Sequence, residues 1–141
     1  MAKPKLTPSD IYPSVYYDDP KEAIEWLCRA FGFEKKLVVP GPDGGIKHSE
    51  LVLGTGVIMV GLAMSERGCA SPRRAGATTQ GIAVHVDDPD AHFARAKAAG
   101  AEIVQGLKDE DYGSRGYTVK DLEGHQWYFA TYRPGAWWTE G

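Results

Sequence analysis

Most of this 141-residue sequence consists of two copies of one pattern. Asp18-Asp19-Pro20 recurs 69 residues later as Asp87-Asp88-Pro89. Three glycines recur at a separation of 68, with Gly32, Gly45 and Gly56 matching Gly100, Gly113 and Gly124. A single deletion within the helical segment explains the change of separation, and ordered matches of this kind indicate an internal duplication. The chain is therefore expected to fold as two related units.

Each copy begins with a strand that is followed by a helix. Residues 81–86 alternate apolar side chains with small or polar ones, which is typical of a strand with one buried face. Residues 11–17 take the same place in the first copy. The aspartate after each strand suits a helix N-cap, and the proline after it suits the first helical position. We expect helices over residues 21–31 and 90–99.

Three further strands follow the helix in each copy, separated by turns rich in glycine. The expected strands are residues 33–39, 47–53 and 57–62 in the first copy and residues 102–105, 116–120 and 126–131 in the second. The repeating unit is therefore βαβββ. Residues 63–80, between the copies, are rich in Gly, Ala, Ser and Thr, and they form either a mobile linker or a flap over a ligand pocket.

Charge and composition exclude several classes of protein. The net charge is −3 and the pI is near 5.8, whereas a nucleic-acid-binding domain is usually strongly basic. No apolar run approaches the roughly 18 residues of a membrane span, and residues 1–5 have no apolar targeting block. Cys28 and Cys69 are far apart and form no C-x-x-C motif. We therefore expect a cytoplasmic protein that binds neither nucleic acid nor membrane.

Three stretches of the sequence carry a resemblance to a known superfamily, namely residues 15–20, 31–34 and 121–127. Together with the doubled βαβββ unit, they resemble the vicinal oxygen chelate (VOC) superfamily. This group includes glyoxalase I, extradiol dioxygenases, fosfomycin-resistance enzymes and bleomycin-resistance proteins. Residues 121–127 are closest in style to the small bleomycin-resistance-like members. The resemblance covers about residues 9–133.

The resemblance implies a fold and a division of the chain. The fold class is α+β, with two tandem βαβββ modules that form curled mixed sheets and carry their helices outside. One domain, residues 1–141, would comprise module 1 at about 9–62, the linker at 63–80, module 2 at about 81–133 and an aromatic tail at 134–141. The concave faces of the sheets would hold the ligand.

Strand periodicity indicates which side chains would line that concave face, because alternate residues of a strand point to opposite sides. The apolar residues Ile82, Val84 and Val86 are assigned to the core, as are Trp127 and Phe129. The candidate ligand-binding residues are Tyr12, Ser14, Tyr16, His48, Glu50, Met59, His85, Gln126 and Tyr128. Aromatic and mixed polar side chains of this kind suit a flat or amphipathic organic molecule.

Metal-dependent members of the superfamily place one ligand near the start of each module's first strand and one in its last strand. Carried over through the Asp-Asp-Pro repeats, these positions fall on Tyr12, Gly81, Met59 (or Val60) and Tyr128. Zinc, iron and manganese need imidazole or carboxylate donors there, and these residues supply none. We expect no metal ion and no other cofactor. The alternative is one divalent metal ion displaced to His48, Glu50 and His85.

Other catalytic chemistry has little support in the sequence. It contains no G-x-S-x-G, H-E-x-x-H or Walker A motif, and we assign no catalytic residue. Glu50 and His85 could share a proton in acid–base chemistry if the fold brings them within about 3 Å of one another. His92 is assigned to a polar stretch of helix, and His125 lies beside a turn.

The sequence thus favours a metal-independent protein that binds and sequesters an aromatic or amphipathic compound. The resemblance implies a homodimer in which each cavity is built from modules of two chains. The alternative is a lyase, isomerase or dioxygenase of the same superfamily that uses the displaced metal ion. A third possibility is an interaction module with Trp137 and Trp138 as its contact surface.

Overall fold

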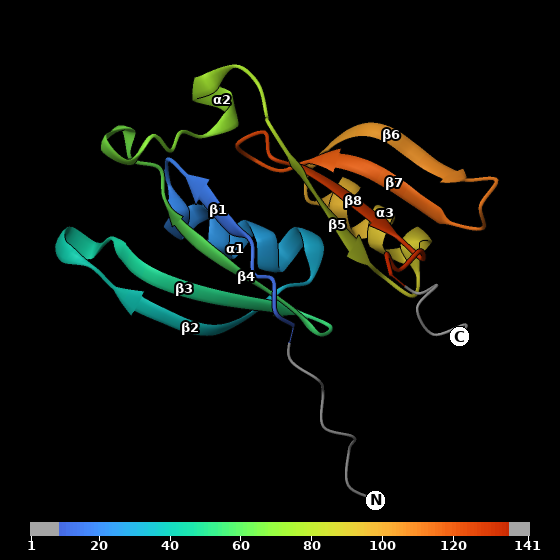
Figure 1. Cartoon of the computed structure of the whole chain (residues 1–141), viewed down its shortest axis with the longest axis horizontal. Coiled ribbons are helices and arrows are strands. Elements are labelled where there is room, and N and C mark those ends of the chain that lie inside the picture. The colour runs from blue at the N-terminus through green and yellow to red at the C-terminus, as the bar shows by residue number, and fades with distance from the viewer. Residues whose placement is uncertain (1–8, 136–141) are drawn as a thin grey trace, which may run out of the picture. The chain divides into compact units, whose positions relative to one another are not determined.

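The computed structural model describes residues 9–135. The chain divides into two compact units, Met1–Ser71 (unit 1) and Pro72–Gly141 (unit 2). Each unit holds one copy of the repeat (Figure 1). Trp137 and Trp138, the residues of the predicted contact surface, lie outside the described residues.

Unit 1 folds as βαβββ. Its elements are β1 (Ser14–Tyr17), α1 (Pro20–Phe31), β2 (Glu34–Pro40), β3 (Ile46–Leu53) and β4 (Gly56–Leu62), with short 3₁₀ turns at Pro42–Gly44 and Ser65–Arg67. The strands form one sheet in the order β1-β4-β3-β2. Strand β1 runs parallel to β4, and the other pairs are antiparallel. Helix α1 packs on one face of this sheet (Figure 1).

Unit 2 repeats the same plan after a short helix. Its elements are α2 (Pro72–Ala75), β5 (Gly81–His85), α3 (Pro89–Ala98), β6 (Glu102–Asp109), β7 (Arg115–Lys120) and β8 (Gln126–Ala130). The sheet has the order β5-β8-β7-β6, with β5 parallel to β8 and the other pairs antiparallel. Helix α3 packs on one face of it (Figure 1). The predicted α+β class with tandem βαβββ modules is confirmed.

The local signals at the helix starts act as the sequence predicts. The carboxylate of Asp19 accepts a hydrogen bond from the N–H of Glu22 at 3.1 Å. The carboxylate of Asp88 accepts one from the N–H of Ala91 at 3.0 Å. A proline follows each aspartate at the first helical position, where a missing N–H costs nothing. Both copies therefore begin their helix with the same cap.

The first strand is shorter than predicted. Strand β1 begins at Ser14 rather than at residue 11, so Tyr12 lies before the strand. Pro13 has no N–H to donate to a neighbouring strand, although its carbonyl accepts the N–H of Met59 at 2.9 Å. The strand parity that assigned Tyr12 to the concave face therefore does not apply to it.

Two further boundaries differ from the prediction. The strand expected over residues 102–105 continues as β6 to Asp109, and an irregular register between Gln105 and Lys108 lets it pass Gly106. The segment 63–80 is not uniformly irregular, because it contains the 3₁₀ turn Ser65–Arg67 and helix α2.

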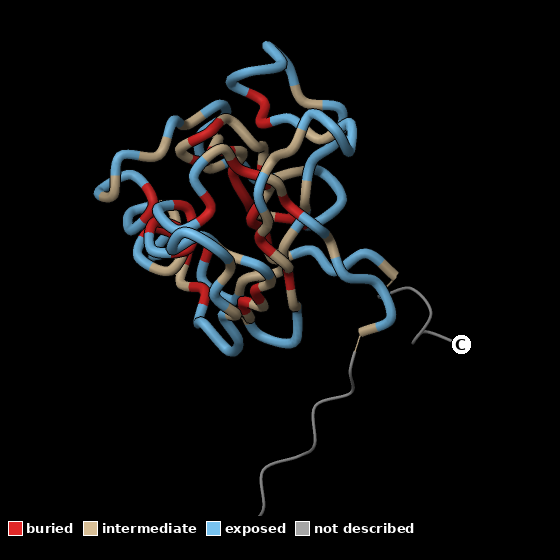
Figure 2. The backbone as a smooth tube through the Cα atoms, turned by 90° about the vertical axis from the view of Figure 1, so that its left-hand side faces the viewer, coloured by how far each residue is buried: buried red, intermediate tan, exposed pale blue. Residues whose placement is uncertain are grey.

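The two units differ in how much of their helix is buried. Helix α1 buries seven residues, Pro20, Ala23, Ile24, Trp26, Leu27, Ala30 and Phe31, whereas α3 buries only Pro89 and Ala96. The sheet of unit 2 instead buries Tyr117, Val119, Trp127 and Phe129. Figure 2 shows buried positions recurring along the strands and helices, with exposed positions in many of the connections. Trp127 and Phe129 lie in the core, as predicted, whereas Ile82, Val84 and Val86 are only half-buried.

Candidate ligand-binding site

Each sheet has one face covered by its helix and a second face, which we call the open face. In unit 1, Val15 and Tyr17 are buried on the helix side, so Ser14 and Tyr16 point to the open face. Met59 pairs with Ser14 across the parallel ladder. The ring of Tyr16 lies over its partner Gly61, 3.5 Å from the place that a Cβ on this glycine would occupy. The structure thus places Ser14, Tyr16 and Met59 on one face of unit 1.

Strand β3 adds an acid–base pair to the open face of unit 1. His48 and Glu50 alternate with the buried Ser49 and Leu51. The Nε2 atom of His48 lies 2.8 Å from a carboxylate oxygen of Glu50. Both side chains are about two-fifths exposed, at 40% and 41%. The pair is therefore preorganised and open to solvent.

The open face of unit 2 carries the remaining candidates. On β8, Gln126 and Tyr128 alternate with the buried Trp127 and Phe129. Tyr128 pairs with Ala83 on β5, whose small side chain leaves room beside the tyrosine ring. Gln126 and Tyr128 therefore share a face that the small residues of β5 do not cover.

His85 lies at the end of β5 and is held by two hydrogen bonds. Its Nδ1 donates to the carbonyl of Thr131 at 2.9 Å, and its Nε2 lies 2.9 Å from the carboxylate of Asp87. A metal ligand needs a free nitrogen lone pair, and both ring nitrogens are engaged here. His85 thus forms a hydrogen-bonded part of the wall of unit 2.

Two tyrosines that the sequence reasoning missed gather beside Tyr128. Tyr112 and Tyr132 meet edge to face, with ring centroids 5.4 Å apart. A hydrogen bond with Tyr128, together with partial burial, raises the pKa of Tyr112. The hydroxyl of Tyr128 also lies 3.3 Å from that of Ser114. We call Tyr112, Tyr128 and Tyr132 the tyrosine cluster. Strand parity could not find Tyr112 or Tyr132, because both lie outside the strands.

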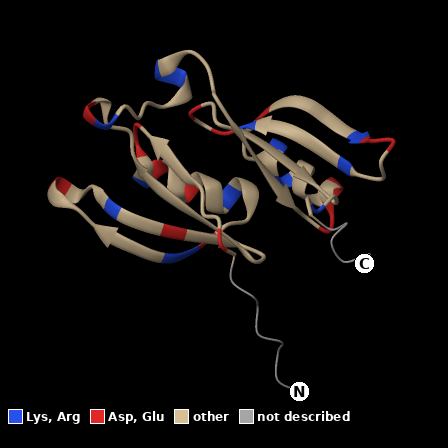
Figure 3. Cartoon of the chain, viewed as in Figure 1, with Lys and Arg blue, Asp and Glu red and all other residues tan. Residues whose placement is uncertain are grey.

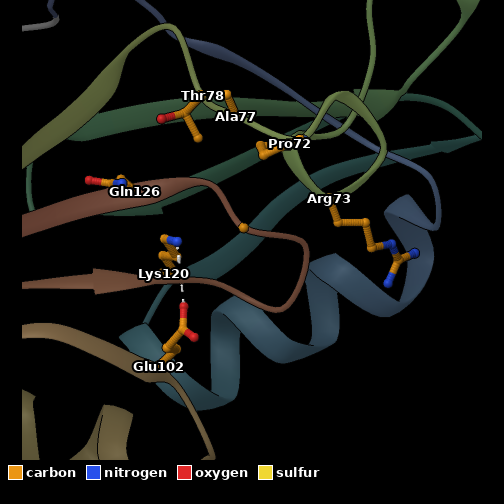
Figure 4. A pocket seen from close by; sticks show the side chains of 9 residues that line it. Pro72, Arg73, Ala77, Thr78, Glu102, Lys120 and Gln126 are labelled. Carbon is orange, nitrogen blue, oxygen red and sulfur yellow. Dashed lines mark ion pairs between the residues drawn. The ribbon is translucent and has the colours of Figure 1, made fainter.

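A pocket of about 530 Å³ lies at the other end of the same face of unit 2. Its lining residues are Pro72, Arg73, Gly76, Ala77, Thr78, Glu102, Lys120, Gly124 and Gln126 (Figure 4). We call it the polar pocket. The Lys120 ammonium lies 3.7 Å from the Glu102 carboxylate. Lys120 pairs in register with Glu102 on one neighbouring strand and with Gln126 on the other. One candidate from the sequence, Gln126, therefore lines a defined cavity.

The wall of the polar pocket is fixed to the turn between β7 and β8. The N–H of Arg73 donates to the carbonyl of Glu123 at 3.0 Å, and its guanidinium lies 3.6 Å from the Glu123 carboxylate, which is 1% exposed. Gly124 approaches so closely that a Cβ there would lie 3.2 Å from Pro72. Helix α2 is thus docked on unit 2 by both backbone and side-chain contacts.

The four positions expected from metal-dependent relatives do not fit a metal ion. Gly81 has no side chain, Met59 is a soft donor, and the hydroxyl of Tyr128 lies within the tyrosine cluster. The hydroxyl of Tyr12 bonds the carbonyl of Ser9. Within residues 9–135, no three His, Cys, Asp or Glu side chains gather closely enough to hold an ion. His48 and Glu50 meet in unit 1, and His85 belongs to unit 2.

His92 lies on helix α3, as expected, but its ring faces the sheet. Its Nδ1 lies 2.6 Å from the hydroxyl of Tyr117, and its ring centroid lies 4.1 Å from that of Phe129. His92 therefore packs between α3 and the sheet rather than on a polar surface. Burial also raises the pKa of Tyr117.

Comparison with known proteins decides the family. The profile of the Glyoxalase/Bleomycin resistance protein/Dioxygenase superfamily matches residues 11–129. The chain belongs to this superfamily. It is 35% identical over 119 residues to an uncharacterized protein of Mycobacterium bovis, covering 82% of this chain and 78% of that protein. The predicted VOC membership is confirmed.

Solved structures of the superfamily share the fold. The chain is 42% identical to TioX from Micromonospora sp. ML1, with a TM-score of 0.70, and the match covers 86% of this chain and 97% of that one. It is 18% identical to TnmS3, an antibiotic binding protein from Streptomyces sp. CB03234, with a TM-score of 0.65 and coverage of 92% and 96%. No helix within residues 9–135 is long and apolar enough to cross a membrane. Figure 3 shows charged residues of both signs in each unit.

Proposed function

We propose that the chain is a metal-independent binding protein of the bleomycin-resistance type, which sequesters a small aromatic or amphipathic compound in the cytoplasm. The single observation that carries this proposal is the tyrosine cluster on the open face of unit 2. Tyr112 and Tyr132 remain 59% and 40% exposed, although together they present a large apolar surface. Exposed aromatic groups that are held in fixed geometry are typical of sites that bind flat ligands by stacking.

The donor set supports binding without a metal ion. The positions that would hold an ion in metal-dependent relatives carry Tyr12, Gly81, Met59 and Tyr128, which lack imidazole and carboxylate groups. Further support comes from TnmS3, an antibiotic binding protein that shares this fold. The catalytic repertoire of the superfamily is not needed for such a role.

The site is proposed to be completed by a second copy of the chain. The cavity would then use the open faces of both units, including Ser14, Tyr16 and Met59 in unit 1. Size-exclusion chromatography with light scattering tests this proposal, with the mass of a dimer as the expected result. A monomer that still binds a ligand with full affinity would contradict it.

The binding proposal is tested with phenylnaphthylamine, a neutral aromatic compound whose fluorescence rises in an apolar site. The EDTA-treated protein should bind it saturably, and Tyr128→Ala should weaken binding about tenfold, since an aromatic contact and its buried area are lost. Tyr128→Phe keeps the ring and is the matched control, with affinity within about threefold. Absence of saturable binding would contradict the proposal.

Metal independence is tested by elemental analysis of the protein purified without added metal. We expect substoichiometric zinc, nickel, iron and manganese, and unchanged binding of phenylnaphthylamine after chelation. One tightly bound ion per chain would overturn this part of the proposal.

A second candidate function rests on the His48–Glu50 pair at 2.8 Å. In a metal-dependent lyase, isomerase or dioxygenase, this pair would supply two of the ligands of a displaced ion. A His48→Ala variant that lost an otherwise stoichiometric metal ion would favour the enzyme over the binding protein.

A further inference from the structure

We infer that the polar pocket of unit 2 receives an anionic end of the ligand whose flat part lies on the tyrosine cluster. This inference rests on the proposed function, and it adds the charge and the orientation of the ligand. It assigns a role to Lys120, Glu102 and Thr78, none of which the strand pattern singles out.

The pocket and the cluster lie on one surface. Gln126 lines the pocket and Tyr128 belongs to the cluster, and the two are alternate residues of β8 on its open face. Two residues along a strand span about 7 Å. A compound with one flat ring system and one charged substituent is long enough to contact both.

The polar lining favours an anion. Lys120, Gln126 and Thr78 can all donate hydrogen bonds into the pocket, whereas Glu102 is its one carboxylate. The Lys120–Glu102 pair is long, at 3.7 Å, and exposed, with side-chain exposures of 39% and 69%. Such pairs contribute little to stability, so an incoming anion can replace Glu102 at low cost.

Arg73 does not supply the charge. Its guanidinium is occupied by Glu123 at 3.6 Å. Figure 4 shows its side chain pointing away from Lys120 and Gln126, whereas the side chains of Lys120 and Glu102 point toward one another. Lys120 is therefore the cation that we assign to the ligand.

The rest of the lining leaves space for a substituent. Gly76, Ala77 and Gly124 are small, and the volume of about 530 Å³ lies in the range of ligand pockets, roughly 300–1,000 Å³. Helix α2 is docked on the β7–β8 turn, which holds this wall in place.

Unit 1 shows that the fold does not require a positive charge at the position of Lys120. The same row of its sheet carries Glu34, Val52 and Val57 in register. In unit 2 the corresponding residues are Glu102, Lys120 and Gln126. The two copies thus share the glutamate, and unit 2 has hydrogen-bond donors where unit 1 has two valines.

The test compares two probes with the same rings. Anilinonaphthalene sulfonate carries a sulfonate that phenylnaphthylamine lacks. Lys120→Met should weaken binding of the sulfonate probe about tenfold, because a charge-assisted hydrogen bond is lost, and should change binding of the neutral probe less than about twofold. Glu102→Gln should act in the opposite direction and tighten binding of the sulfonate probe about threefold, since a competing carboxylate is removed.

Lys108→Met is the matched control. Lys108 lies at the other end of β6, pairs with Glu110 at 3.5 Å, and carries the same charge outside the pocket. This variant should leave both affinities unchanged. Circular dichroism would verify that all three variants are folded.

Each outcome separates the two proposals. Equal effects of Lys120→Met on both probes, or none on either, would overturn the anion pocket and leave the aromatic site intact. Opposite effects of Lys120→Met and Glu102→Gln on the sulfonate probe alone would support the pocket, because damage to the fold cannot produce both signs. Failure of both probes to bind the unaltered chain would overturn the proposed function and this inference together.

Discussion

In unit 1 the helix contributes large core residues, among them Ile24, Leu27 and Phe31, whereas in unit 2 the large core residues come from the sheet. Leu27 of α1 and Ala96 of α3 are 69 residues apart in the repeat, and both are fully buried. Ser49 of β3 and Tyr117 of β7 are 68 residues apart, and both are also fully buried. At these positions unit 1 has the large residue on its helix and the small one on its sheet, and unit 2 has the reverse.

This difference in residue size between matched core positions distinguishes the requirements of the repeated backbone from those of core packing. The aspartate caps recur, and so do the glycines after the helices, Gly32 and Gly100 with φ of 85° and 89°, because a particular backbone geometry depends on them. The core positions need only a constant total volume, since interiors are close-packed. The small, buried Ser49 is held by two hydrogen bonds to Val60. Its hydroxyl donates to the carbonyl of Val60 at 2.7 Å and accepts a hydrogen bond from the N–H of Val60 at 3.0 Å.

The largest expected effect breaks the core of unit 2 from the sheet side. Trp127 is 1% exposed, and its indole N–H donates to Asp121 at 3.0 Å. Trp127→Ala should lower the free energy of unfolding by about 3–5 kcal/mol through the cavity that it leaves. Trp127→Phe keeps most of the bulk and should lose about 1–3 kcal/mol, mainly from the lost hydrogen bond to the buried Asp121 carboxylate. Urea denaturation measures both, and a loss below about 1 kcal/mol for Trp127→Ala would show that the helix carries the core of unit 2 as well.

A second substitution distinguishes the matching turns of the two units. Gly124 has a φ of +95°, and a Cβ there would lie 3.2 Å from Pro72. Gly56, its counterpart in the repeat, would place a Cβ 3.4 Å from the carbonyl oxygen of Leu53, which is ordinary contact. Gly124→Ala should therefore cost about 1–3 kcal/mol, and Gly56→Ala only about 0.5 kcal/mol. Equal losses of melting temperature in the two variants would contradict the difference.

The helix caps are expected to be equivalent. Asp19→Ala and Asp88→Ala should each lower the free energy of unfolding by about 1 kcal/mol, because each leaves a helical N–H without its cap. Asparagine at either position retains the acceptor and is the matched control. Urea denaturation of the four variants measures this, and a cost present in only one unit would show that the caps have diverged with the cores.

The sequence predicts the parts of this fold that are decided locally. Asp19 and Asp88 identify both helix starts, because capping involves residues three positions apart. The alternation along β8 correctly separates buried Trp127 and Phe129 from Tyr128. The alternation along β1 does not apply to Tyr12, because the strand begins at Ser14, after Pro13.

The site contains contacts that no local pattern encodes. Tyr112 and Tyr132 join Tyr128 from outside the strands, where periodicity gives no direction. The polar pocket exists because Arg73 and Glu123, fifty positions apart, hold α2 on the β7–β8 turn. Such long-range contacts depend on packing, which the repeat does not specify.

The smallest expected effect concerns a clamp that only unit 2 possesses. The guanidinium of Arg115 on β7 binds both carboxylate oxygens of Asp90 on α3, at 2.8 and 3.0 Å, and also contacts Asp109 at 3.1 Å. The matching positions of unit 1 carry two lysines, Lys47 and Lys21, which cannot pair. The hydrogen bonds from Arg115 lower the pKa of Asp90, and the pKa of Arg115 is raised in turn.

A lowered pKa fixes the sign of the pH dependence. The pairing of Asp90 stabilises the folded state above the ordinary carboxyl pKa of 3.8 and is lost as the pH falls through the lower folded value. Arg115→Gln should therefore move the titration midpoint of Asp90, followed by carboxyl-carbon NMR, upward toward 3.8. Lys97→Gln, on the last turn of α3, removes one charge without breaking the clamp and should leave the midpoint in place. An unchanged midpoint in Arg115→Gln would contradict the clamp, because it would show that the guanidinium does not lower the pKa of Asp90.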